Sequence, residues 1–180
     1  MRKIVAGLFV SVDGVVEAPD AWTGPYFSPE VGQLIESMMA DGDTLLLGRV
    51  TYQGFADSFG GQTGGVADRM NNFEKVVVST TLDKAEWQNS TLLGGNVAEE
   101  ISKLKQRPGR NINMSGSGTL VDWLLRQGLL DEFHLLQFPV VVGHGKRLFG
   151  TEGAQVGLKL AGSESFGTGV LHLTYQTAGG

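Results

Sequence analysis

The residues whose types and spacing best suit chemistry form a short polar segment at 115–118, with the sequence SGSG. The segment follows Ile112 and Met114, which alternate as in a strand, and it precedes Thr119, which can cap a helix. Backbone N–H groups at the start of a helix point outward at the positive end of its dipole, and such groups bind anions. The segment therefore predicts a phosphate site between a strand and a helix.

This segment matches neither of two common nucleotide-binding motifs. The G-x-G-x-x-G fingerprint of dinucleotide-binding proteins would require glycine where Val121 stands. A P-loop would require serine or threonine after Gly145-Lys146, where the chain has Arg147, and glycine where it has Val140. The sequence therefore indicates neither a standard Rossmann protein nor a P-loop protein.

The composition is that of a soluble globular protein with one domain. The chain has 180 residues, of which 41% are hydrophobic and 18% charged, and this length is enough for a substantial core. The net charge of −5 and the absence of a run of lysine and arginine argue against a nucleic-acid partner. Because no apolar stretch approaches the roughly 20 residues of a membrane span, we expect a cytoplasmic protein.

Residue types that hold metals or act as nucleophiles are scarce. Cysteine is absent, which excludes disulfides and a thiolate nucleophile. His134, His144 and His172 lack the spacing of metal ligands or of a hydrolase triad, so no metal site is expected. The charges of residues 143–147 (GHGKR) could help to bind a phosphate, and the alternative is a solvated surface loop.

Strands alternate with helices along most of the chain. Apolar strands are expected at 4–10, 44–47, 75–79, 91–93, 112–114 and 132–138. Ser28, followed by Pro29, begins one helix, Asn96 caps another, and a short helix begins near Gly48. This alternation predicts a mainly parallel sheet with helices on both faces. The pattern of 158–164 and 170–177 adds a C-terminal antiparallel hairpin.

Several segments, in this order, resemble the dihydrofolate-reductase-like superfamily, and most closely the C-terminal reductase domain of the bifunctional deaminase-reductase of riboflavin biosynthesis. They are SVDG at 11–14, LGRVT at 47–51, VSTT at 78–81, SGSGTL at 115–120, LDE at 130–132 and PVVVG at 139–143. The resemblance implies a single domain over 1–180, with three α/β/α layers and a mixed, mainly parallel sheet. The H-x-E and P-C-x-x-C motifs of the zinc deaminase are absent, so the chain corresponds to a stand-alone reductase domain.

The resemblance implies an NADPH-dependent reductase whose cofactor lies against three strand ends. The implied cofactor-binding residues are Gly48, Arg49, Thr51, Ser79, Thr80, Thr81, Gly116, Ser117, Gly118 and Thr119. The residues at 48–51 would clamp the pyrophosphate. The adjacent hydroxyls of residues 79–81 would receive the 2′-phosphate that distinguishes NADPH from NADH. In the alternative interpretation, Arg49 is a solvated residue, Thr51 caps a helix and the hydroxyls form a turn.

Asp13 and Ser115 are the candidate catalytic residues. Asp13 belongs to the family's Ser-x-Asp-Gly motif, where it either caps a turn of its loop or faces the substrate. Ser115 stands where the riboflavin reductases carry a glutamate that contacts the substrate, which argues for a different substrate. Trp22, Tyr26 and Phe27 either offer flat surfaces to a heterocycle or plug the edge of the core.

More than one function is compatible with the resemblance. A reductase would pass a hydride from NADPH to a heterocyclic or ribosyl group, with 5-amino-6-(5-phosphoribosylamino)uracil as the first expected substrate and dihydrofolate as the second. A non-catalytic nucleotide-binding module is the alternative that Ser115 favours. The alternation of Leu171, Leu173 and Tyr175 predicts that the C-terminal hairpin pairs across a two-fold axis in a homodimer.

Overall fold

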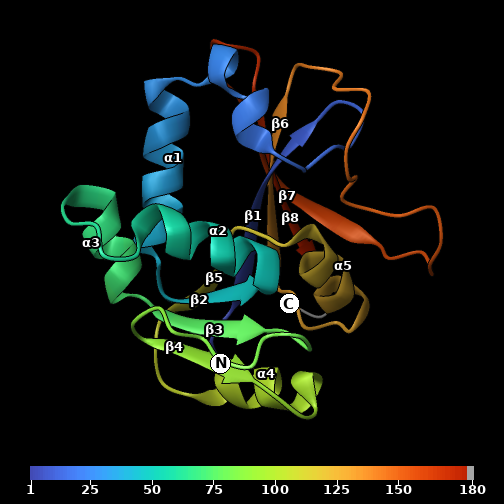
Figure 1. The fold of residues 1–180 in the computed structure, drawn as a ribbon. Helices are drawn as coiled ribbons and strands as arrows, with labels where there is room; N and C mark the ends of the chain where they lie inside the picture. Colours follow the sequence, from blue (N-terminus) through green and yellow to red (C-terminus); the bar gives the residue numbers. More distant parts are fainter. Residues whose placement is uncertain (178–180) are drawn as a thin grey trace.

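The computed structural model describes residues 1–177, and its centre is an eight-stranded mixed sheet (Figure 1). The strand order is β4-β3-β2-β5-β1-β6-β8-β7, with parallel pairing from β4 to β6 and antiparallel pairing of β8 with β6 and β7. The strands are β1 (Ile4–Ser11), β2 (Gly42–Gly48), β3 (Glu74–Val78), β4 (Ser90–Leu93), β5 (Asn111–Met114), β6 (Glu132–Phe138), β7 (Leu158–Ser165) and β8 (Leu171–Thr177). The expected mainly parallel sheet with a C-terminal hairpin is confirmed.

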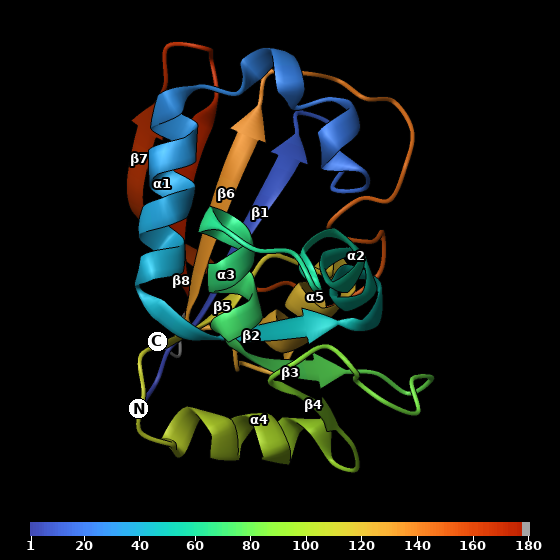
Figure 2. The same cartoon turned by 60° about the vertical axis from the view of Figure 1, so that its left-hand side comes forward.

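Helices cover both faces of this twisted sheet (Figure 2). They are α1 (Pro29–Ala40), α2 (Arg49–Phe59), α3 (Gly65–Asn72), α4 (Val97–Gln106) and α5 (Gly118–Arg126), and two 3₁₀ turns, η1 (Pro19–Ala21) and η2 (Gly24–Tyr26), precede α1. The first three helices pack on one face, and α4 and α5 pack on the other. The result is the expected three-layer α/β/α architecture.

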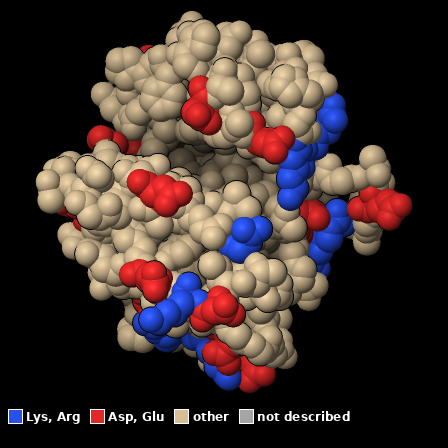
Figure 3. All heavy atoms as spheres, in the orientation of Figure 1, with Lys and Arg blue, Asp and Glu red and all other residues tan. Residues whose placement is uncertain are grey.

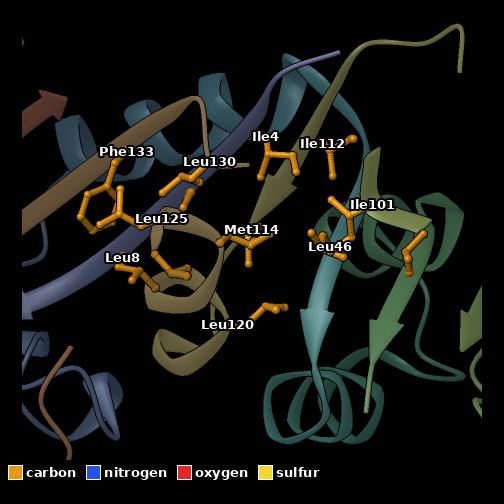
Figure 4. Packing of buried hydrophobic residues seen from close by; sticks show 14 of the residues in the cluster. Ile4, Leu8, Leu46, Ile101, Ile112, Met114, Leu120, Leu125, Leu130 and Phe133 are labelled. Carbon is orange, nitrogen blue, oxygen red and sulfur yellow. The ribbon is translucent and has the colours of Figure 1, made fainter. Parts of the chain in front are cut away.

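The largest core cluster fills the face under α4 and α5 (Figure 4). Ile4 and Leu8 of β1 point to this face because side chains of a strand alternate between its two sides. Leu120 and Leu125 of α5 and Ile101 of α4 close over them. Burial of such side chains stabilises the fold by about 1.5–3 kcal/mol each, so this cluster fixes where α5 begins relative to the sheet.

Two smaller clusters fill the opposite face. Leu45 of β2 packs with Tyr52 of α2 and with Trp87 in the connection between β3 and β4. Val31 of α1 packs with Phe138 at the end of β6. The helices α1 and α2 thus belong to separate clusters on the same face of the sheet.

The expected starts of α1, α2 and α4 are confirmed, since α2 begins at Arg49 directly after Gly48, and the start of α5 differs. Ser28 caps α1 and Asn96 caps α4, each accepting a hydrogen bond from the N–H three residues on. In α5, however, the cap is Ser117, which accepts from the N–H of Leu120 at 3.3 Å. The expectation that Thr119 caps this helix is wrong, because Thr119 already lies in the first turn of the helix.

The helix α3 was not expected from the sequence, which predicted no element between the short helix near Gly48 and the strand at 75–79. Its last turn is held by the side chain of a buried lysine in the strand that follows it. The Nζ of Lys75, a fully buried residue of β3, donates to the carbonyl oxygens of Met70, Asn71 and Phe73 at 2.8, 3.1 and 2.9 Å. These bonds supply donors to carbonyl oxygens at the end of the helix, which have no N–H partner within the helix.

The C-terminal hairpin exposes part of one apolar face. Leu160 of β7 is 52% exposed and Leu171 of β8 is 38% exposed, whereas Leu173 and Tyr175 are half-buried. Within residues 1–177, no helix combines the length and apolar character needed to span a membrane. The same residues hold no group of three or more His, Cys, Asp or Glu side chains placed to bind a metal.

Candidate functional site

The carboxyl ends of β2 and β5 form the point where chain connections diverge. These strands are neighbours, yet β2 leads through α2 toward β3 while β5 leads through α5 to β6, on the opposite side. Since α2 and α5 lie on opposite faces, a crevice is left outside the strand ends. Ligands of open α/β sheets bind in such crevices. Two of the three predicted binding segments lie here.

These two segments contact each other through their glycines. A Cβ on Gly48 would lie 2.6 Å from Ser117 Oγ, and one on Gly116, whose φ is +131°, would lie 2.9 Å from Thr51 Oγ1. Both positions therefore require glycine so that the loop after β2 can approach the loop after β5. These glycines let the two loops approach each other closely, which brings the N-termini of α2 and α5 together.

The start of α2 is open to an anion. Its N-cap is Gly48, which supplies no side-chain acceptor, so the first N–H groups of this helix have no cap. Arg49 is exposed at the first helical position, and its Nη1 donates to Gln53 Oε1 at 3.0 Å. Thr51 is not the helix cap and instead faces Gly116. The N–H groups and the guanidinium could hold an anion here more readily than the start of α5, where Ser117 caps the helix.

The start of α5 carries a cation that the sequence indicated only weakly. Thr119 Oγ1 accepts a hydrogen bond from Nζ of Lys146, which lies in the loop after β6. Gly118 borders the same loop, since a Cβ there would lie 3.3 Å from Val16 and 3.5 Å from Leu148. In the sequence, only the basic stretch at 143–147 indicated this cation. The contact of Lys146 with Thr119, 27 positions earlier, depends on the fold.

Ser79, Thr80 and Thr81 lie at the end of β3, next to β2. Ser79 Oγ accepts from the N–H groups of Thr81 at 3.1 Å and Leu82 at 3.0 Å, so this hydroxyl forms a turn. Thr80 and Thr81 are exposed, and their side chains are open to a ligand. Of the three predicted hydroxyls, the structure leaves two at the surface and gives one a structural role.

Asp13 holds two loops together. Its carboxylate accepts from Ser11 Oγ at 2.6 Å and from the N–H groups of Val142 at 3.0 Å and Gly143 at 2.8 Å. The bond from Ser11, followed by the two backbone bonds, keeps the pKa of Asp13 far below its ordinary value. An ionised carboxylate has no proton to give, so the structure supports the turn-forming interpretation of Asp13.

Glu17 makes a second contact between the same loops. Its Oε2 accepts from the backbone N–H of Lys146 at 2.9 Å. Between the two carboxylates, Val15 and Arg147 form an antiparallel bridge. The segment 11–28 is therefore fastened along its first half to the loop that follows β6.

The aromatic residues of segment 11–28 divide into core and surface. Trp22 is 9% exposed and packs edge-on to Phe138, with ring centroids 5.8 Å apart, and Tyr26 packs on the same ring at 6.5 Å. Both plug the edge of the core. Phe27 is 46% exposed and lies 6.3 Å from Phe9 of β1, so it is the aromatic surface that a heterocycle could contact.

Ser115 is exposed at the end of β5, directly before the loop that contacts Gly48. Its hydroxyl can donate or accept a hydrogen bond but carries no charge. In Figure 3 the surface is hollowed between the part that includes α1, η1 and η2 and the part that includes α2 and α5, with both acidic and basic side chains around the hollow.

Two further concavities lie outside the hollow. One, of about 400 Å³, lies between α2 and the connection from β3 to β4 and is lined by Tyr52, Gln53, Leu82, Lys84 and Trp87, among others. The other, of about 670 Å³, lies at the amino ends of β3 and β4 beside Glu74 and Ser90. Neither is formed by the predicted binding residues, so neither replaces the crevice between β2 and β5.

Comparison with known proteins gives one family and several similar structures. The RibD C-terminal domain family model matches residues 2–172. The uncharacterized protein YyaP of Bacillus subtilis is 28% identical over 186 residues, which cover 99% of this chain and 96% of YyaP.

Solved structures show the same fold at lower identity. A Shewanella sp. PV-4 protein attributed to riboflavin biosynthesis superposes with a TM-score of 0.80 at 20% identity, covering 97% of this chain and 98% of that one. Dihydrofolate reductase from Enterococcus faecalis, solved in complex with NADP(H), superposes with a TM-score of 0.65 at 16% identity, covering 98% and 96%. These likenesses establish a dihydrofolate-reductase-like fold.

Proposed function

We propose, because this chain belongs to the RibD C-terminal domain family, that it is an NADPH-dependent reductase that acts on a small heterocyclic or ribosyl substrate. The observation that carries the proposal is the meeting of the N-termini of α2 and α5 at the crevice between β2 and β5. The dihydrofolate reductase of similar fold binds NADP(H), which supports the choice of cofactor.

The residues at the crevice fit the charged parts of NADPH. The uncapped N–H groups of α2 and the exposed Arg49 would hold the diphosphate. The surface hydroxyls of Thr80 and Thr81, at the end of the strand next to β2, would receive the 2′-phosphate. When bound, NADPH supplies the hydride, and the protein supplies orientation and exclusion of water.

The protein's own groups would position a flat substrate. The exposed edge of Phe27 beside Phe9 offers an apolar contact, and Ser115 offers a neutral hydrogen-bonding group at the end of β5. Segment 11–28, held by Asp13 and Glu17, would shield the crevice from solvent. Since Asp13 is held in its ionised form, the proton that completes the reduction would come from water or a hydroxyl.

A precursor of the type 5-amino-6-(5-phosphoribosylamino)uracil is the substrate class that the family favours, with dihydrofolate as the second candidate. The neutral Ser115 at the end of β5 supports a further candidate function, a nucleotide-binding module without catalysis. The experiment that separates them follows the consumption of NADPH after addition of a pyrimidine or a pterin substrate. Turnover supports the reductase. Binding of NADPH without turnover of any such substrate supports the binding module.

We also propose that the protein forms a homodimer through its C-terminal hairpin. The exposed Leu160 and Leu171 lie on one face of β7 and β8, at the end of the sheet where β7 has no further strand among residues 1–177. Such a face gains stability when a second copy covers it.

A further inference from the structure

Lys146 places an ammonium group at the N-terminus of α5. Its Nζ donates to Oγ1 of Thr119, the second residue of that helix. We propose that Lys146 is a cofactor-binding residue that pairs with the diphosphate of NADPH, an inference that rests on the proposed function. On binding, its ammonium would exchange the neutral hydroxyl of Thr119 for a phosphate oxygen.

The electrostatics of this position point to an anion. The N-terminus of a helix carries a partial positive charge, so a cation there is disfavoured unless an anion lies beside it. Among residues 1–177, no carboxylate oxygen lies within 4.0 Å of Lys146 Nζ, and its partner is an uncharged hydroxyl. A cation at the N-terminus of a helix without an anionic partner is locally unfavourable, and locally unfavourable arrangements are typical of functional sites.

The neighbouring Arg147 shows the contrast. Its Nη2 lies 3.8 Å from Asp13 Oδ2, and its Nε donates to the Asp13 carbonyl at 2.9 Å. Arg147 is therefore used to fasten two loops. Lys146, one residue earlier, points its charge away from these carboxylates and toward the helix start that borders the crevice.

The backbone of Lys146 is held firmly enough to aim its side chain. Its N–H donates to Glu17 Oε2 at 2.9 Å, and its carbonyl accepts from the N–H of Val16 at 2.9 Å. The preceding Gly145 has φ of +96°, and a Cβ there would lie 2.9 Å from Glu17 Oε2. Because this position is fixed on segment 11–28, a phosphate bound by Lys146 would also tie that segment to the cofactor.

The test compares the affinity of wild type, Lys146→Gln and Lys146→Arg for NADPH, measured by cofactor fluorescence at low and at high salt. Lys103→Gln, on the far end of α4, is the matched control with the same change of charge. Losing one charge-assisted hydrogen bond should weaken NADPH binding about tenfold at low salt. The difference should shrink at high salt, and Lys146→Arg should retain most of the affinity.

Each outcome has a distinct meaning. Failure of the wild type to bind NADPH would contradict the proposed function. Binding by the wild type with equal affinity in Lys146→Gln would overturn only the role of Lys146. A second titration, with ribose 5-phosphate, separates cofactor from substrate: weakening of that ligand alone by Lys146→Gln would also overturn the assignment to the cofactor. Thermal melting of each variant without ligand reports whether it is folded, and Lys146→Arg tests the charge independently.

Discussion

The rings of His134 and His172 stack across β6 and β8, with Nδ1 of the first 2.8 Å from Nε2 of the second. Only one of these two facing nitrogens can carry a proton if the hydrogen bond is to form. His134 Nε2 also lies 2.8 Å from Glu132 Oε1, and the other oxygen of that carboxylate, Oε2, lies 3.6 Å from Lys3 Nζ. The pair therefore accommodates one shared proton but not two facing N–H groups.

This geometry predicts a loss of stability in mild acid. Burial, and then the charge of His134, lower the pKa of His172 below its ordinary 6.5, although Glu164 opposes the shift. As pH falls below 6.5, the unfolded chain takes up this proton before the folded one does. The contribution of His172 to the free energy of unfolding is thus complete above that pH and is lost as pH falls through the lower folded pKa.

The measurement is urea denaturation between about pH 7 and pH 5. His172→Gln should flatten the dependence of the unfolding free energy on pH. His144→Gln, in an exposed loop, should keep the dependence of the wild type. An equally steep decline in His172→Gln would show that another group is responsible.

The role of a single residue could be predicted from the sequence where the residue belongs to a local motif. The Ser-x-Asp-Gly motif gave Asp13 two possible roles, in forming a turn or in facing the substrate, and the bonds to Val142 and Gly143, 129 and 130 positions away, support the structural role. Lys75 was not predictable, because a lysine in a strand is expected to reach solvent. Its burial depends on carbonyls that α3 brings to it and on the ring of Trp87, 4.2 Å from Nζ.

At the scale of elements, α5 matters most because its first turn borders the crevice. Ser117→Ala should destabilise the protein by about 1 kcal/mol, since it removes the acceptor for the N–H of Leu120. Thr119→Ala should cost less than about 0.5 kcal/mol, because Thr119 is exposed and does not cap the helix. Chemical denaturation of the two variants measures both values. The reverse order would mean that the helix begins at Thr119 in solution.

The strands and most helices followed from periodicity and capping residues, as Ser28 and Asn96 illustrate. The helix α3 did not, because its sequence, GVADRMNN, begins with glycine and ends with two asparagines, which are weak helix formers. Its last turn is held by tertiary contacts: Asn71 Oδ1 accepts from Trp87 Nε1 at 2.7 Å. Contacts of this kind cannot be read from a local pattern.

For the whole molecule, the proposed homodimer makes a direct prediction. Leu160→Glu places a charge on the exposed apolar face of the hairpin and should yield a monomer by light scattering. Lys159→Gln, on the other face of β7, should leave the dimer intact. A wild-type protein that is monomeric at micromolar concentration would contradict the proposal.

The alternation of strands and helices predicted the layered fold, but it did not place β5 between β2 and β1. That position makes the crevice, since it sets the loop of Gly116 against Thr51 and Gly48 against Ser117. The resemblance to the dihydrofolate-reductase-like superfamily supplied what the local pattern lacked. The contacts of Lys146 came from neither source, because they join loops that are distant in sequence.

The most direct test of the account is a fluorescence titration of the wild-type protein with NADPH and with NADH. The uncapped start of α2, Arg49 and the open hydroxyls of Thr80 and Thr81 predict saturable binding of NADPH and weaker binding of NADH. Absence of binding by both nucleotides would contradict the central claim that the crevice between β2 and β5 is a nicotinamide cofactor site. Preference for NADH would remove the role given to the hydroxyls.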